Sequence, residues 1–282
     1  MTHWERYTVL ITVFGIAGCI ARSTLTQDGS ASSQPNGISS QAARFFPDPQ
    51  VAALAAALER SDWAGAENAL RAGANVNAIG NEDMYPLVWT MYVKNKAAFE
   101  WLLNHGADPN FDSGGGDGCA LIWAAEADDP DWLRILLAHK ANPNLMHKTS
   151  IGATETPLLA AGGLCRLANL KMLIAAGADI NYQRPKQNFG GTPAIDAAQS
   201  GFFEGVYVLL EAGADIRPRT TGGFDLTYFV AGYRIDPRDD RYPWREKVLQ
   251  LLRERGADVD GALKAASDAE AHDRKDNPWR YR

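Results

Sequence analysis

This sequence has few of the groups from which enzymes and metal sites are usually built. Its 282 residues include three cysteines and five histidines. It has no Walker-type glycine loop with a lysine, no Gly-x-Ser-x-Gly elbow and no His-Glu-x-x-His pair. We therefore predict no catalytic residues, no metal ligands and no cofactor, and we expect that the chain is not an enzyme.

The chain also lacks an excess of basic residues. Its formal net charge is −6, which disfavours binding to nucleic acid. Hydrophobic residues make up 46% and charged residues 22%, as expected for a stacked domain with a sizeable core.

The amino terminus carries an apolar stretch that is too short to span a bilayer as a helix. This stretch, residues 7–17, follows Arg6 and resembles the apolar region of a secretory signal. It ends in Ile16-Ala17-Gly18-Cys19, which resembles a bacterial lipobox. The resemblance implies a signal peptide over residues 1–18 and a lipid-modified Cys19, with an ordinary cleaved signal or a chance cysteine as the alternative.

The lipobox resemblance also predicts where the protein works. Two or more acyl chains at about 0.8 kcal/mol per buried CH₂ would anchor the protein without spanning the membrane. The predicted location is the periplasmic side of a bacterial membrane. Because Ile20 is not aspartate, resemblance to enterobacterial sorting favours the outer membrane over the inner one.

A polar segment follows the predicted anchor. Residues 22–46 are rich in Ser, Gln, Gly, Thr and Asn and contain few large apolar groups. Such a composition is typical of disordered chain. We therefore predict a lipidated, disordered tether over residues 19–46.

A spacing of twenty residues recurs between a turn position and a glycine-type position. It joins Pro86 to Gly106, Ala120 to Lys140, Pro157 to Gly177, and Pro193 to Gly213. Apolar residues lie three, four and seven positions before each glycine-type position, as on a helix with one buried face. Each unit is therefore predicted to be two antiparallel helices, with the glycine ending the second helix in a left-handed conformation.

These units resemble the ankyrin repeat. The segments that carry the resemblance are Gly191-Thr192-Pro193-Ala194, Glu155-Thr156-Pro157-Leu158, residues 210–215 and Ile180-Asn181. The resemblance covers roughly residues 48 to 260 and implies an all-α ankyrin-repeat solenoid of about six helix-turn-helix units, with hairpin connectors and a C-terminal capping helix. The domain is expected over residues 47–272, with Asp258–Ala271 as the closing helix and residues 273–282 as a polar tail.

Two units depart from the repeat pattern. Lys140 stands in place of the usual glycine, which costs the turn about 1 kcal/mol. The last unit has 31 residues instead of 20 between Asp225 and Gly256. This spacing predicts an eleven-residue insertion between its helices, around residues 234–244.

Several polar positions have structural explanations that we favour. The recurring aspartates after Gly-Ala are expected to end helices, and the cluster of Glu126, Asp128, Asp129 and Asp131 is expected to be a solvated loop. His105 and His139 would lie about 10 Å apart in stacked repeats, too far to share a metal. Cys119 and Cys165 are predicted to be unpaired, packed thiols, because the repeat register separates them by more than a disulfide can bridge.

The remaining function is recognition of a protein, for which ankyrin stacks use their first helices and hairpin tips. Trp89, Trp123 and Tyr228 share one register position and would form an aromatic ladder, with core packing as the alternative. The other predicted partner-binding residues are Tyr92, Glu126, Asp196 and Gln199. We expect a specific protein partner, no nucleic acid, and a monomer when the chain is free.

Bacterial lipoproteins with ankyrin repeats resemble immunity proteins that neutralise type VI secretion effectors, including lipases. The most concrete hypothesis is therefore an immunity protein that blocks a secreted toxin sterically, through its concave face or its inserted loop. The alternative is an envelope scaffold or accessory protein that supports a resident enzyme.

Overall fold

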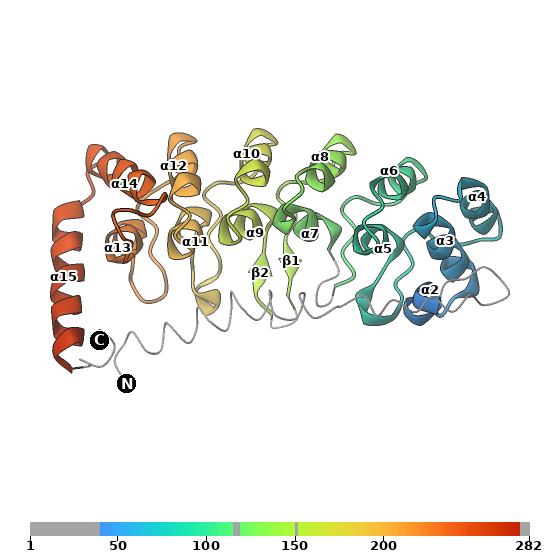
Figure 1. Ribbon diagram of the computed structural model, residues 1–282, viewed down its shortest axis with the longest axis horizontal. Helices are drawn as coiled ribbons and strands as arrows, with labels where there is room; N and C mark the ends of the chain where they lie inside the picture. The colour runs from blue at the N-terminus through green and yellow to red at the C-terminus, as the bar shows by residue number, and fades with distance from the viewer. Residues whose placement is uncertain (1–39, 115–118, 150–151, 277–282) are drawn as a thin grey trace.

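The computed structural model describes residues 40–114, 119–149 and 152–276. The predicted signal peptide, Cys19 and most of the predicted tether lie outside these residues. Over the described range, helix pairs follow one another in chain order along an elongated rod (Figure 1). The rod is the solenoid that the repeated spacing predicts.

Two rows of helices make up the rod (Figure 1). The first helices are α3 (Pro49–Glu59), α5 (Pro86–Tyr92), α7 (Ala120–Glu126), α9 (Pro157–Gly163), α11 (Pro193–Gln199) and α13 (Leu226–Gly232). The second helices are α4 (Trp63–Arg71), α6 (Lys96–Asn104), α8 (Asp131–Ala138), α10 (Leu167–Ala175), α12 (Phe203–Glu211) and α14 (Tyr242–Glu254). The six predicted helix pairs are therefore confirmed within the described residues.

The helices begin and end where the twenty-residue spacing predicts. Pro86 and Pro193 occupy the first turn of α5 and α11, where the missing N–H leaves no helical hydrogen bond unmade. The glycine-type positions all have left-handed backbone, with φ of 90° at Gly106, 63° at Lys140 and 86° at Gly177. Lys140 thus adopts the glycine conformation despite its side chain.

The predicted apolar stripe forms the core. The residues four and seven positions before each glycine-type position are all fully buried: Leu102, Phe99, Leu136, Leu133, Leu173, Leu170, Leu209 and Val206. The residues three positions before are buried in α6 and α12 and half buried in α8 and α10. The stripe therefore faces the first helices along its centre and solvent along one edge.

Side-chain hydrogen bonds join successive repeats. The Asn144 Oδ1 accepts from the Asp179 N–H at 2.7 Å, and the Asn181 Oδ1 accepts from the Asp215 N–H at 2.8 Å. Each aspartate also folds onto its own connector, as when the Asp179 Oδ1 accepts from the Asn181 N–H at 2.9 Å. The recurring aspartate after Gly-Ala is thus structural, as its fixed place in the repeat predicts.

The connectors contain little regular structure. Strands β1 (His147–Lys148) and β2 (Thr154–Glu155) pair antiparallel in one connector. Short 3₁₀ turns η1 (Asn81–Asp83) and η2 (Lys186–Asn188) lie in two others. Within the described residues, the hairpin prediction is therefore met by strand pairing in the β1–β2 connector and by a single antiparallel bridge between Asp112 and Cys119 in the preceding one.

The predicted tether is wrong at its C-terminal end. Residues Ser40–Phe45 form helix α2, and Ala42, Phe45 and Phe46 are at most 3% exposed. The rings of Phe45 and Phe46 lie 5.8 and 6.0 Å from the ring of Trp89. The folded domain therefore begins before residue 47, because these two aromatic rings cover the open end of the first repeats.

The other end of the rod is covered by a long helix. Helix α15 runs over Val259–Asp276 and packs against α13. It begins after Asp258, whose Oδ1 accepts from the Gly261 N–H at 2.9 Å. The helix extends past the predicted domain boundary at residue 272 into the predicted polar tail.

The predicted insertion becomes partly loop and partly helix. Helix α13 ends at Gly232 and α14 begins at Tyr242, and α14 has 13 residues where α12 has 9. Ion pairs two residues apart hold the loop, with Asp236 to Arg238 at 2.8 Å and Asp239 to Arg241 at 2.7 Å. The insertion is therefore an ordered turn.

The two described cysteines are unpaired but differ in burial. Cys119 is buried and Cys165 is exposed. Burial raises the pKa of the Cys119 thiol to about 11. The prediction of packed thiols is wrong for Cys165, which occupies a left-handed turn position with φ of 59° after α9.

Candidate binding surface

We define the inner surface as the solvent-facing parts of the first helices α5 to α13 and of the connectors that lead into them. Half-buried residues on it include five of the predicted partner-binding residues: Tyr92, Trp123, Glu126, Gln199 and Tyr228. Their side chains keep part of their surface exposed. Their role in binding a partner stays a prediction.

Trp89 does not belong to this surface. Its side chain is 0% exposed, and its Nε1 donates to the Ala55 carbonyl at 3.0 Å. Its ring also packs against Phe45, Phe46 and Tyr92. At Trp89 the alternative of core packing therefore holds and the predicted aromatic ladder is wrong, because α2 and α3 cover this position at the end of the stack.

Asp196 is also buried, contrary to its predicted role as an exposed polar contact. It occupies the register position of Trp89 and Trp123, but on α11, and is 8% exposed. Its Oδ2 accepts a hydrogen bond from the Arg184 guanidinium. The side chain of Asp196 is thus held against Arg184 of the connector that precedes α11.

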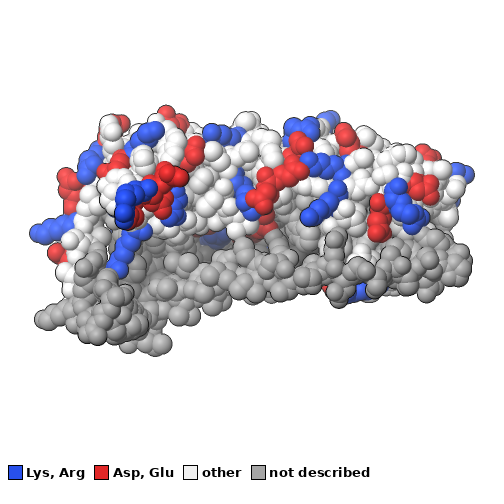
Figure 2. Space-filling model, in the orientation of Figure 1, with Lys and Arg blue, Asp and Glu red and all other residues white. Residues whose placement is uncertain are grey.

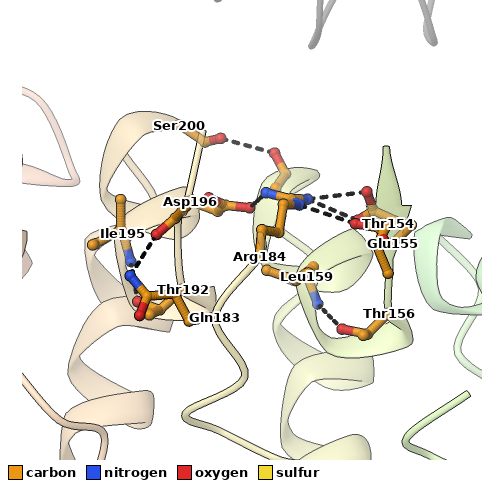
Figure 3. Close-up of polar contacts among 12 residues, drawn as sticks. Thr154, Glu155, Thr156, Leu159, Gln183, Arg184, Thr192, Ile195, Asp196 and Ser200 are labelled. Carbon is orange, nitrogen blue, oxygen red and sulfur yellow. Dashed lines mark hydrogen bonds and ion pairs between the residues drawn. The ribbon is translucent and has the colours of Figure 1, made fainter. Parts of the chain in front are cut away.

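Arg184 joins Asp196 to a second carboxylate (Figure 3). Its Nη2 donates to both Glu155 carboxylate oxygens, at 3.2 and 3.0 Å, and its Nε donates to the Thr154 carbonyl at 3.2 Å. The side chains of Arg184 and Glu155 are 16% and 18% exposed. We call Glu155, Arg184 and Asp196 the ion triad.

The ion triad contains more negative than positive charge. Two carboxylates share one guanidinium, and burial raises the pKa of both Asp196 and Glu155, an effect that Arg184 offsets in part. The carboxylates in turn raise the pKa of Arg184, which is charged at any ordinary pH. The Asp196 Oδ1 has no hydrogen-bond partner among the described residues.

A second polar pair, between the buried His147 and the half-buried Asp112, lies in the neighbouring connectors. The Nδ1 of His147, which is 2% exposed, lies 3.0 Å from both Asp112 carboxylate oxygens. His147 pairs across the β1–β2 ladder with Glu155. Buried polar contacts therefore link three successive connectors of the inner surface.

An aromatic cluster borders the ion triad on the side of α13. Its half-buried members are Phe189, Phe224, Tyr228 and Phe229. The Phe229 ring lies 6.1 Å from Phe189 and 5.4 Å from Tyr228, and the Phe224 ring stacks on Tyr228 at 4.2 Å. Rigid, partly exposed rings of this kind supply large contact area in protein interfaces.

A cleft of about 1160 Å³ opens between the last connector and the start of α15. Its walls include Phe224 and Tyr228 from the aromatic cluster, with Arg217, Arg219 and Arg255. The asparagine side chains that join successive repeats, such as Asn144 and Asn181, have no counterpart here. Arg217 occupies the position that Asn181 occupies one repeat earlier. The Arg217 side chain instead pairs with Asp215 at 2.9 Å.

The acidic cluster after α7 is neutralised by neighbouring repeats. Lys96 from the preceding repeat lies 2.5 Å from Asp129 and 2.9 Å from Asp131, and these contacts lower the pKa of both carboxyls. Arg166 from the following repeat pairs with Asp128. The cluster therefore ties three repeats together at the surface.

Charge on the visible described face is mixed. Figure 2 shows basic and acidic side chains interspersed along the face turned to the viewer, with no extended region of one sign. Among the described residues, no group of three or more His, Cys, Asp or Glu is placed to hold a metal ion. Nor is any helix in the described ranges long and apolar enough to cross a membrane.

Comparison with known proteins agrees with this architecture. Residues 121–220 match the family described as ankyrin repeats (3 copies). The chain is 32% identical to the nuclear factor NF-kappa-B p105 subunit of Gallus gallus over 191 residues, which cover 65% of this chain and 18% of that protein. It is 30% identical to ankyrin repeat and SOCS box protein 6 of Homo sapiens over 172 residues, which cover 57% of this chain and 40% of that protein.

Solved structures show the same fold. The ankyrin repeat domain of Bcl-3, described as a unique member of the IkappaB protein family, matches with a TM-score of 0.58 and 20% identity, over 73% of this chain and 86% of that one. The ankyrin repeat protein EF0377 matches with a TM-score of 0.56 and 24% identity, over 71% of this chain and 97% of that one. The fold is therefore an ankyrin-repeat solenoid.

Ankyrin repeats indicate a protein–protein interaction module, and this is the class of protein that the fold defines. The chain spans less than half the length of the curated relatives that it matches. Their whole activities are therefore not transferred to it.

Sequence reasoning missed the ion triad and most of the aromatic cluster. Glu155 and Arg184 lie in connectors of variable length, whose contacts the repeat spacing does not fix. One signal was present: Asp196 occupies the register of two tryptophans, and a carboxylate at a packed position requires a cation or several donors. That requirement points to a basic residue in an adjacent connector.

Proposed function

We propose that this protein captures one specific protein partner on its inner surface. The observation that carries the proposal is the half-buried aromatic cluster beside the ion triad. Aromatic rings already fixed by packing lose little conformational entropy when a partner covers them. They adjoin charged groups that discriminate between partners.

The proposal includes a membrane location. The lipobox-like sequence around Cys19 supports lipid attachment and a place on the periplasmic side of a bacterial membrane, the outer one in preference to the inner. Replacing Cys19→Ser should move the protein from the membrane fraction to the soluble fraction and abolish incorporation of labelled palmitate. Membrane retention of the serine variant would overturn this part.

The most specific form of the proposal is an immunity protein. The partner would be an antibacterial type VI secretion effector such as a lipase, and the inner surface or the loop before α14 would cover its active site. A membrane tether would hold the inhibitor where such a toxin arrives. Steric occlusion needs no catalytic group on the inhibitor.

Site-specific photo-cross-linking in living cells tests the proposal. A photoreactive residue at Gln199, on the inner surface, should capture one protein, whereas the same residue at Glu254, exposed at the end of α14, should not. Capture of a secreted toxin, with protection from that toxin lost in Tyr228→Ala, supports immunity. Capture of a resident envelope enzyme would favour the scaffold alternative, and equal capture at both positions would contradict binding by the inner surface.

A further inference from the structure

The ion triad is one cation short. Glu155 and Asp196 carry two negative charges, and Arg184 supplies one positive charge. Arg184 donates hydrogen bonds from its Nη2 to Glu155, from its Nη1 to Asp196 and from its Nε to the Thr154 carbonyl oxygen. An uncompensated charge at a buried site is costly unless a further donor neutralises it.

Asp196 is the carboxylate with an oxygen that lacks a hydrogen-bond donor. The residue is 8% exposed, and its Oδ1 has no hydrogen-bond partner among the described residues. This oxygen lies against Gly191, where an added Cβ would come within 2.5 Å of it. Glu155 is the more accessible carboxylate, with 18% of its side chain exposed.

A second cation at Glu155 would complete the site. Arg184 could then remain with Asp196, and each carboxylate would have its own positive partner. A further carboxylate adjoins Glu155 through His147. His147 pairs with Glu155 across the β1–β2 ladder, and its Nδ1 lies 3.0 Å from the Asp112 carboxylate oxygens.

The aromatic cluster begins next to the triad. The same Cβ placed on Gly191 would lie 2.5 Å from the Asp196 Oδ1 and 3.2 Å from the Phe189 ring. Phe189 contacts Phe229, which leads to Tyr228. A ligand that brings a cation to the triad therefore meets the aromatic cluster on the Asp196 side of Arg184, where an apolar side chain can pack, and an aromatic ring also attracts a cation.

We infer that the inner surface recognises an extended protein segment that carries an arginine or lysine beside an apolar side chain. The cation pairs with Glu155, and the apolar side chain packs on Phe189 and Phe229. This inference rests on the proposed function and specifies the chemistry of the partner.

Selection from a library of short random peptides tests the inference. Peptides selected on the purified full chain should share an arginine or lysine next to an aromatic or aliphatic residue. The best of them should bind Glu155→Gln at least about tenfold more weakly, because a charge-assisted hydrogen bond is lost. Its affinity for Glu82→Gln should be unchanged, since that carboxylate pairs with Arg44 at the other end of the rod.

A change in the peptide avoids any question about folding of the variants. Replacing its arginine by citrulline removes the charge, keeps the shape and should weaken binding to the unaltered protein by a similar factor. Neutral or acidic selected peptides, no selected peptides, equal binding of citrulline, or equal binding by Glu155→Gln would each overturn the inference.

The failure of the inference and that of the proposed function are distinguishable. Capture of one protein at Gln199 with no preference for basic peptides would leave the proposed function standing and remove the inference. Absence of capture at Gln199 would remove the proposed function whatever peptides are selected.

Discussion

At the scale of single residues, Arg184 decides whether two buried carboxylates are tolerated. Removing one partner of a buried ion pair leaves a charge without compensation, which costs about 3–5 kcal/mol. Arg184→Ala should therefore lower the free energy of unfolding by that amount. Asp196→Asn keeps a hydrogen-bond acceptor for Arg184 and removes the excess charge, so its effect should stay within about 1 kcal/mol.

Urea unfolding measures both variants, and Arg217→Ala is the matched control. Its guanidinium pairs with Asp215 at the surface and is 86% exposed, so the change should cost little. An Arg184→Ala loss no larger than that of the control would contradict the assigned role of the triad.

The ion triad should also give stability a recognisable dependence on pH. Burial raises the folded-state pKa of Asp196, so its charged form is disfavoured on folding, and the cost is present above that pKa. The cost disappears as pH falls through the folded pKa towards the unfolded value of about 3.9. The side chain introduced by Asp196→Asn cannot titrate. Compared with the unaltered protein, this variant should therefore have a more favourable free energy of unfolding at pH 7 than at pH 4, as measured by urea unfolding at both pH values.

Glu155 responds in the same direction, because burial raises its pKa too. The Asp196 charge also raises the Glu155 pKa, so Asp196→Asn lowers that pKa and changes the comparison in the same direction. The free energy of unfolding of Asp196→Asn minus that of the unaltered protein should fall as pH falls. A value that stays constant or rises would contradict a raised Asp196 pKa.

At the scale of helices and turns, one repeat carries a residue that its backbone does not favour. Lys140 ends α8 with φ of 63°, where the equivalent Gly177 after α10 has φ of 86°. A side chain costs about 1 kcal/mol in this conformation. Lys140→Gly should therefore raise the free energy of unfolding by up to about 1 kcal/mol.

Gly177→Ala is the reciprocal test. A Cβ at Gly177 would meet no atom within 4 Å, so the substitution changes backbone strain without a clash. It should destabilise by about 1 kcal/mol in thermal or urea unfolding. If both substitutions changed stability in the same direction, left-handed backbone would not be the controlling factor.

The sequence predicts the helices well and the connectors poorly. Helix starts such as Pro86 and ends such as Gly106 follow from local backbone chemistry, which a fixed spacing reveals. Contacts between connectors depend on how loops of unequal length fold back, so Arg184 and its partners were not predictable from spacing. Core packing of Trp89 was one of two alternatives that the spacing left open, because its cover, α2, comes from a polar segment that carries two phenylalanines at its end.

At the scale of the whole molecule, the described helices of the solenoid pack mainly against their neighbours along the rod. Phe46 is 2% exposed and packs against Trp89 at the amino-terminal end. Phe46→Ala should cost about 3 kcal/mol or more, whereas Ile79→Ala, at a side chain that is 52% exposed, should cost little. Each repeat of a quasi-one-dimensional array contacts mainly its neighbours. We therefore expect Phe46→Ala to lower local stability mainly in the repeats near the mutated end.

Hydrogen exchange measured by mass spectrometry resolves this distribution. Backbone amides of α3 to α6 should lose protection in Phe46→Ala, while those of α11 to α14 keep theirs. Such a gradient means that Asp196 and the aromatic cluster are held by repeats near the α15 end and do not depend on the amino-terminal end. Equal loss of protection in every helix would instead show a single cooperative unit, in which any change at the amino-terminal end reaches the inner surface.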